Sequence, residues 1–213
     1  MPVNPQRIGV YGGTFDPPHL GHLILAETAA DQLDLARVLF VPAADPPHKS
    51  DADMRSTADR RLALVQHAIA GNPRFAVSRV DMDRPGPHYS VDMLRLLRQE
   101  WPDAELFFLL GADSLRDLPT WSRPAELIAL AALGVMPRPG VNLDIDALAR
   151  TIPGVRERIH WLETPLIGLS ASAIAARAAA GLSIRYQVPD AVCLYIEQNG
   201  LYSDYEPTNT PKI

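Results

Sequence analysis

Short apolar runs alternate with amphipathic segments along most of this chain. The apolar runs are typical of buried strands, and apolar positions that recur every three or four residues in the other segments predict helices. The expected strands cover residues 8–11, 38–41, 75–80, 105–110, 132–136 and 159–162. The expected helices cover residues 17–33, 56–69, 90–100, 122–130, 143–152, 170–180 and 189–199.

Strands that alternate with helices in this way predict an α/β fold, with a mainly parallel sheet and helices on both faces. We expect a single domain over residues 1–203, followed by a mobile tail over residues 204–213. Ligands of such sheets bind beyond the carboxyl ends of the strands. Residues of unusual character stand at these ends, so we expect one site to gather them: Gly12, Gly13, residues 42–49, residues 111–113 and Arg138.

The most informative segment follows the first expected strand and reads Gly12-Gly13-Thr14-Phe15-Asp16-Pro17-Pro18-His19-Leu20-Gly21-His22. A strand, a glycine turn and a helix together place backbone N–H groups and a positive helix end against a phosphate. Asp16 is the expected helix N-cap, with Pro17 at the first helical position. Residues three apart share a helix face, so His19 and His22 are expected to point at one anion. Zinc binding is the weaker hypothesis for this histidine pair, because no cysteine cluster or nearby third ligand accompanies it.

Composition narrows the class of protein further. The chain has 213 residues, 47% of them hydrophobic and 21% charged, which is typical of a globular protein. We expect a cytoplasmic protein with no membrane partner, because no long apolar run or signal peptide is visible and Cys193 is the only cysteine. The formal net charge of −5 argues against a nucleic-acid partner but is compatible with a local positive pocket for phosphorylated substrates.

The glycine and histidine segment resembles the signature loop G-T-F-D-P-x-H-x-G-H of the nucleotidyltransferase superfamily. Every position of the signature is matched, by Gly13, Thr14, Phe15, Asp16, Pro17, His19, Gly21 and His22. The resemblance implies a Rossmann-like nucleotidyltransferase fold and transfer of a nucleotidyl group from a nucleoside triphosphate.

Later motifs are similar to those of one branch, the bacterial nicotinate-nucleotide adenylyltransferases. Residues 46–49 look like the P-P-H-K loop of that branch, residues 84–90 like its R-x-G-x-S-Y-T segment, and residues 111–121 like its G-x-D-x-L block with a following tryptophan. Residues 188–202 resemble its closing V-P…Y-I…L-Y pattern. The resemblance implies transfer of AMP from ATP to nicotinate mononucleotide, with release of pyrophosphate. Mg²⁺ would arrive with ATP and bridge its phosphates, without a dedicated set of protein ligands.

The resemblance also implies three groups of site residues. The implied catalytic residues are His19, His22 and Lys49. The implied ATP-binding residues are Gly12, Gly13, Thr14, Phe15, Gly111, Asp113, Arg138, Ser170, Ser172 and Arg177. The implied mononucleotide-binding residues are His48, Tyr89, Ser90 and Trp121.

One position departs from the pattern of the branch. Its C-terminal phosphate motif reads I-S-x-T-x-I-R, but this chain carries Ala175 at the arginine position, and Arg177 follows two residues later. Two residues rotate a side chain by roughly 200° around an α-helix, so Arg177 cannot simply inherit the role. We expect weaker triphosphate binding, or a substitute cation such as Arg138 or Arg185.

Two alternatives stay open at this point. The first is an adenylyltransferase for another acceptor, nicotinamide mononucleotide or pantetheine phosphate. No single residue of the sequence shows whether the site binds the carboxylate of nicotinate or the amide of nicotinamide. The second is a nucleotide-sensing protein without turnover, which only Ala175 favours. The intact His19 and His22 argue against a sensor, because binding alone does not require both. The sequence leaves the oligomeric state open.

Overall fold

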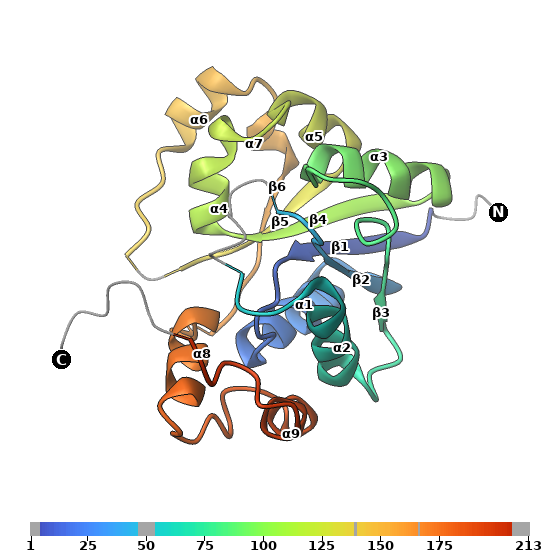
Figure 1. The fold of residues 1–213 in the computed structure, drawn as a ribbon. Coiled ribbons are helices and arrows are strands. Elements are labelled where there is room, and N and C mark those ends of the chain that lie inside the picture. Colours follow the sequence, from blue (N-terminus) through green and yellow to red (C-terminus); the bar gives the residue numbers. More distant parts are fainter. Residues whose placement is uncertain (1–4, 47–53, 139, 166, 206–213) are drawn as a thin grey trace.

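A six-stranded parallel sheet forms the centre of the protein. The computed structural model describes residues 5–46, 54–138, 140–165 and 167–205. Within these ranges the strand order is β3-β2-β1-β4-β5-β6, and every neighbouring pair is parallel (Figure 1). The strands are β1 (Arg7–Gly13), β2 (Arg37–Pro42), β3 (Phe75–Val77), β4 (Glu105–Gly111), β5 (Ala132–Met136) and β6 (Ile159–Trp161).

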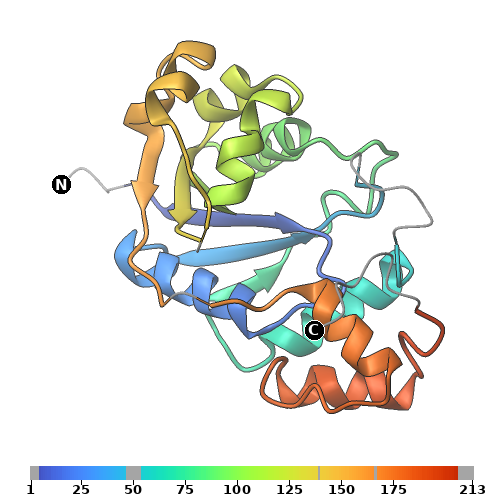
Figure 2. The same cartoon turned by 90° about the vertical axis from the view of Figure 1, so that its left-hand side faces the viewer.

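Helices cover both faces of the sheet, as the sequence predicts (Figure 2). On one side lie α1 (Leu20–Gln32), α2 (Ala58–Ile69), α8 (Ala171–Ala179) and α9 (Asp190–Gln198). On the other side lie α3 (Ser90–Glu100), α4 (Ala112–Asp117), the 3₁₀ turn η2 (Leu118–Thr120), α5 (Pro124–Leu130), α6 (Ile145–Thr151) and α7 (Val155–Arg158).

The central strand β4 shows why its sequence is continuously apolar. Phe107 and Leu109 pack in the core on the α1 side, whereas Leu106, Phe108 and Leu110 pack in the core on the α3 side. Successive side chains of a strand point to opposite faces of the sheet. A strand covered on both faces therefore needs apolar residues at every position, unlike a strand with one face in water. The two hydrophobic cores therefore meet through the sheet and hold its strand ends in fixed positions.

Most expected elements appear close to their predicted bounds, and three differences are instructive. The third strand ends at Val77 instead of residue 80, and the short helices α4 and α7 were not predicted. The first helix begins at Leu20, with His19 as its N-cap, so the prediction that Asp16 caps it and Pro17 opens it is wrong. The carboxylate of Asp16 is instead buried and accepts hydrogen bonds from other segments, which are described below.

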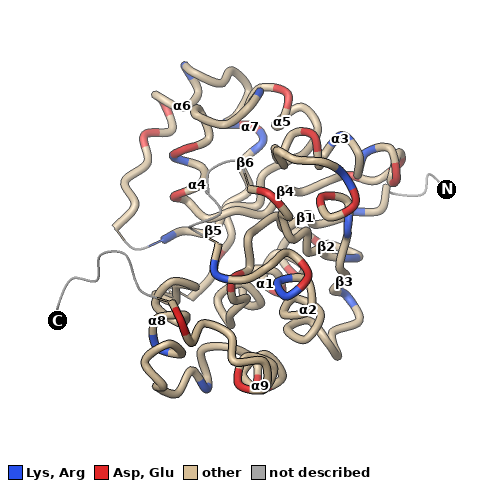
Figure 3. The backbone as a smooth tube through the Cα atoms, in the orientation of Figure 1, with Lys and Arg blue, Asp and Glu red and all other residues tan. Residues whose placement is uncertain are grey.

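Acidic and basic residues are interspersed along the helices and loops of the described structure (Figure 3). None of the described helices is both long enough and apolar enough to cross a membrane. Cys193 is buried in α9, as expected of a small apolar side chain. The expected tail begins with two described residues, and its remainder, residues 206–213, lies outside the described ranges.

Candidate active site

The strand order reverses next to β1, and this reversal positions the site. From β1 the chain runs outward through β2 and β3, and it then returns to pair β4 on the opposite side of β1. In open α/β sheets, the crevice at such a reversal, beyond the carboxyl ends of the strands, is where ligands bind. The glycine and histidine segment leaves β1 at this point, as the sequence predicts.

Two adjacent glycines end β1, and they serve different purposes. A Cβ on Gly13 would lie 3.0 Å from the Phe15 ring, which is tighter than most real Cβ contacts, so a larger residue there would require that ring to shift. A Cβ on Gly12 would meet Met93 and Phe108 at an ordinary 3.5 Å. The ring of Phe15 itself is buried in the core, which leaves only its backbone to face a ligand.

Asp16 joins three distant parts of the chain. Its Oδ2 accepts hydrogen bonds from the backbone N–H groups of Arg55, at 2.9 Å, and Ser56, at 3.1 Å. Its Oδ1 accepts the hydroxyl of Tyr202 at 2.8 Å. Burial and the adjacent Asp16 carboxylate raise the pKa of Tyr202, so this hydroxyl keeps its proton and donates it. The carboxylate thus fixes the loop between β1 and α1 against residues 55–56 and the C-terminal segment.

The two histidines form one stacked unit at the start of α1. Their rings lie 3.7 Å apart between centroids with an interplanar angle of 24°. The backbone N–H of His19 donates to Nδ1 of His22 at 3.0 Å. A neutral imidazole that accepts at Nδ1 carries its proton on Nε2, so His22 presents an Nε2–H donor. Nδ1 of His19 is buried without a hydrogen-bond partner among the described residues.

Burial keeps both imidazoles uncharged at neutral pH. It lowers the pKa of His19 to about 4, with a smaller contribution from the positive charge of Arg138. It lowers the pKa of His22 in the same direction, and His19 and Arg138 add to the effect. An anion bound beside the pair would favour the protonated form and so oppose this shift.

Arg138 joins the histidines from the end of β5. Its Nη1 lies 3.2 Å from Oδ2 of Asp113, on the first turn of α4, and both side chains are about 40% exposed (40% and 38%). A Cβ on Gly111 would collide with the Asp113 carboxylate and come within 3.2 Å of Nε of Arg138. Gly111 therefore allows the ion pair to lie across the end of β4. The structure thus brings three of the predicted strand-end segments to one place.

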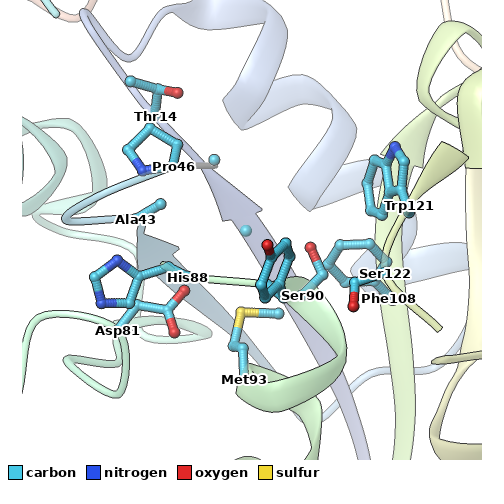
Figure 4. A pocket seen from close by; sticks show the side chains of 13 residues that line it. Thr14, Ala43, Pro46, Asp81, His88, Ser90, Met93, Phe108, Trp121 and Ser122 are labelled. Carbon is cyan, nitrogen blue, oxygen red and sulfur yellow. The ribbon is translucent and has the colours of Figure 1, made fainter. Parts of the chain in front are cut away.

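A mostly apolar cavity of about 270 Å³ lies on the other side of the glycine pair, between the ends of the strands and α3 (Figure 4). Tyr89 and Ser90, the N-cap and first residue of α3, line it. Trp121 lines it as well and meets Phe108 edge to face, with 6.1 Å between ring centroids. The complete lining is Gly12, Gly13, Thr14, Ala43, Pro46, Asp81, His88, Tyr89, Ser90, Met93, Phe108, Trp121 and Ser122.

Two polar residues of this cavity were not predicted. Nδ1 of His88 accepts the backbone N–H of Asp45 at 2.8 Å, which ties the loop after β2 to the loop before α3. Asp81 pairs with Arg84 at 2.6 Å, and burial nevertheless raises the pKa of its carboxyl. Asp81 lies outside the motifs of the sequence, and His88 lies within residues 84–90 but is not among the expected site residues, because the pairing of both loops depends on the folded sheet.

The predicted phosphate motif lies at the start of α8. Ser170 is its N-cap and accepts the backbone N–H of Ala173 at 3.2 Å. Ser172 is exposed on the first turn, whereas Ala175 is fully buried in the core. The guanidinium of Arg177 points elsewhere and donates to the carbonyl of Ser183 at 3.0 Å. This agrees with the expected rotation between positions 175 and 177.

Two further expected residues cannot be placed, since His48 and Lys49 lie outside the described residues. A buried arginine beside the loops after β1 and β2 was also not predicted. Arg61 of α2 is 1% exposed and donates to the backbone carbonyls of Thr14, Ala43 and Ala44. Its spacing of four from the buried Val65 would have placed it on the buried face of the helix.

The sequence matches the cytidylyltransferase-like family over residues 10–177. A protein of Thermomicrobium roseum named "Probable nicotinate-nucleotide adenylyltransferase" is 51% identical over 210 residues, which cover 97% of this chain and 98% of that protein. A protein of Thermus thermophilus with the same name is 46% identical over 197 residues, which cover 92% of this chain and 100% of that protein.

Solved structures share the fold. The nicotinic acid mononucleotide adenylyltransferase of Plasmodium falciparum, complexed with NaAD, matches with a TM-score of 0.77 and 17% identity, over 93% of this chain and 98% of that chain. A second structure of that protein, complexed with APC, matches with a TM-score of 0.74 and 16% identity, again over 93% and 98% of the two chains. These likenesses confirm the predicted Rossmann-like nucleotidyltransferase fold.

Proposed function

This chain belongs to the nicotinate-nucleotide adenylyltransferases of the cytidylyltransferase-like family, and from that membership we propose how its residues transfer AMP from ATP to nicotinate mononucleotide. The phosphate of the mononucleotide attacks the α-phosphorus of ATP in line. The new P–O bond forms as the bond to the β-phosphate breaks, and the products are nicotinate adenine dinucleotide and pyrophosphate. The nucleophile is already an anion, so no covalent intermediate on the protein is required.

The observation that carries this proposal is the stacked histidine pair at the β1–α1 junction. Its fixed tautomer directs the Nε2–H of His22 as a donor, and phosphoryl oxygens gain negative charge during the transfer. Arg138, whose charge acts on both imidazoles, adds a cation at the same strand ends. Catalysis in this arrangement consists of positioning and charge stabilisation.

The two substrates approach from opposite sides of the glycine pair. His22 contacts Tyr11 and Phe15, which pack on the α1 side, whereas the cavity opens on the α3 side. ATP would lie along the histidines and the mononucleotide in the cavity, so that their phosphates meet above Gly12 and Gly13. The backbone of this turn passes between the two half-sites and would meet both phosphates.

The cavity suits the pyridine end of the acceptor. Trp121 and Phe108 supply aromatic walls for a flat ring, and the start of α3 supplies backbone N–H groups at Tyr89 and Ser90. An anionic carboxylate is favoured at a helix N-terminus, whereas a neutral amide gains less there. The same arrangement therefore favours nicotinate over nicotinamide.

The divalent metal of this reaction enters with ATP in our proposal. The described residues contain no group of three or more His, Cys, Asp or Glu side chains that could hold a metal ion. Mg²⁺ prefers octahedral oxygen ligands and is commonly held by substrate phosphates with water. When bound it would neutralise charge on the phosphates, and Asp113 is a partly exposed carboxylate at the strand ends that could face it.

The function is tested with the purified chain, ATP, MgCl₂ and one acceptor at a time. We expect pyrophosphate release with nicotinate mononucleotide, and kcat/KM on the order of tenfold or more lower with nicotinamide mononucleotide, because the helix N-terminus then meets no charge. Pantetheine phosphate should give no turnover. Pyrophosphate release that is equal for the two mononucleotides would refute the assigned carboxylate site, and binding of ATP without any release would favour a sensor.

A further inference from the structure

Arg55 stands where the phosphate motif of this chain lacks its arginine. Ala175 is fully buried among aliphatic side chains, and Arg177 is turned onto the Ser183 carbonyl, so neither position offers a cation at the start of α8. We propose that Arg55 supplies this cation and binds the outer phosphates of ATP. The inference rests on the proposed function and identifies a binding residue that the sequence motifs do not indicate.

The guanidinium of Arg55 connects the catalytic loop with α8. Its Nη2 donates to Oγ of Ser172, on the first turn of α8, at 2.7 Å. Its Nη1 donates to the backbone carbonyl of Asp16 at 3.2 Å. Asp16 precedes His19 by only three residues, so a single side chain touches both the loop that holds the histidines and the helix start that holds the serines.

Arg55 is held in place without losing its charge to a carboxylate. Its backbone N–H donates to Asp16, and the ring of Tyr205 lies 4.8 Å from the guanidinium carbon. None of the ion pairs in the described ranges involves Arg55, whereas Arg138 is paired with Asp113. An arginine ordered by neutral partners keeps its full attraction for an incoming anion.

The donors that remain match a phosphate group. A guanidinium has five N–H donors, and the bonds to Ser172 and Asp16 use two of them. Nε of Arg55 is buried and has no acceptor among the described residues. Around it lie the Ser172 hydroxyl and the positive end of α8, which has nine residues. A terminal phosphate here would meet a charge-assisted donor, a hydroxyl and a helix N-terminus together.

The occupant is the outer part of a nucleoside triphosphate, not its α-phosphate. The histidine pair accounts for the α-phosphate in the proposed function, and α8 lies beyond it across Asp16. The predicted distinction is therefore between ATP and AMP, since AMP lacks the β- and γ-phosphates. A structural role of Arg55 would not separate these two ligands, because it would disturb the whole loop.

The test compares Arg55→Gln with Arg60→Gln, which removes a neighbouring exposed arginine on α2. The measured quantities are KM for ATP, KM for nicotinate mononucleotide and Kd for AMP by calorimetry. For Arg55→Gln we expect KM for ATP to rise by roughly tenfold to a hundredfold, as for loss of a charge-assisted hydrogen bond. The other two constants should stay within about twofold of wild type, and Arg60→Gln should leave all three unchanged.

Two results would overturn the inference. One is a KM for ATP within about twofold of wild type in Arg55→Gln. The other is an equal loss for ATP, AMP and the mononucleotide, which is what a structural residue would give. If Arg55→Gln fails to fold, Arg55→Lys, which keeps the charge but not the fork, decides by the same three constants. Wild-type protein without pyrophosphate release would instead refute the proposed function, so the two failures are distinguishable.

Discussion

Two imidazoles in a 3.7 Å stack cannot both carry charge cheaply inside a protein, and the environment of this pair avoids that repulsion. Burial and the charge of Arg138 lower the pKa of His19 and of His22, so both imidazoles are neutral at neutral pH. Each neutral ring carries one N–H group that can donate a hydrogen bond. In our proposal the pair acts as oriented donors toward phosphoryl oxygens, with no change of protonation before substrate binds.

The lowered pKa of His19 predicts how stability depends on pH. An unfolded histidine titrates near pH 6.5 and His19 in the folded protein near 4, so between these values the unfolded chain binds more protons. The free energy of unfolding therefore falls as the pH is lowered through this window, by about 1.4 kcal/mol per pH unit at most from this residue.

The variant His19→Asn should lack this contribution and keep its helix, because asparagine is a favoured N-cap. Urea unfolding of the unliganded protein at pH 7 and pH 5 measures the difference. We expect wild type to lose on the order of 2 kcal/mol more than the variant over that interval. Equal losses in the two proteins would show that His19 titrates normally.

At the scale of elements, hydrogen bonds between residues far apart in the sequence determine features that local sequence patterns cannot predict. The helices α2 and α8, the latter with Ser170 as its N-cap, match predicted ranges because helix periodicity and capping are local. The start of α1 was predicted wrongly, because a local rule assigns Asp16 to its own helix. In the folded chain the Asp16 carboxylate instead accepts hydrogen bonds from Arg55 and Tyr202, which follow it by 39 and 186 positions in the sequence.

Arg61 fixes the loops after β1 and β2 relative to α2. We expect Arg61→Met to lower the free energy of unfolding by about 2–4 kcal/mol, because it leaves the buried carbonyls of Thr14, Ala43 and Ala44 without their donor. Denaturant unfolding measures this loss, with Arg60→Met as the matched control at an exposed position, where about 0.5 kcal/mol or less is expected. A loss in Arg61→Met no larger than in the control would show that these bonds do not hold the loops.

At the scale of the whole molecule, the alternation of strands and helices was readable from the sequence, but the strand order was not. Apolar patterns report which residues are buried and say nothing about which strands are neighbours. The helices α4 and α7 were not predicted, because segments of six and four residues are too short to show the periodicity of apolar positions in a helix. The signature loop indicated the histidine site, whereas Arg55 and His88 depend on loops that only the assembled sheet brings together.

The assembled sheet places a donor pair and an apolar cavity on opposite sides of one glycine turn, and in our proposal the transfer reaction depends on that arrangement. Its most direct test is the kcat of His22→Asn with ATP and nicotinate mononucleotide. Asparagine retains an acceptor for the His19 N–H but removes the Nε2–H donor. We predict a fall in kcat on the order of 10²–10³ with unchanged thermal unfolding. A kcat within about threefold of wild type would contradict the account.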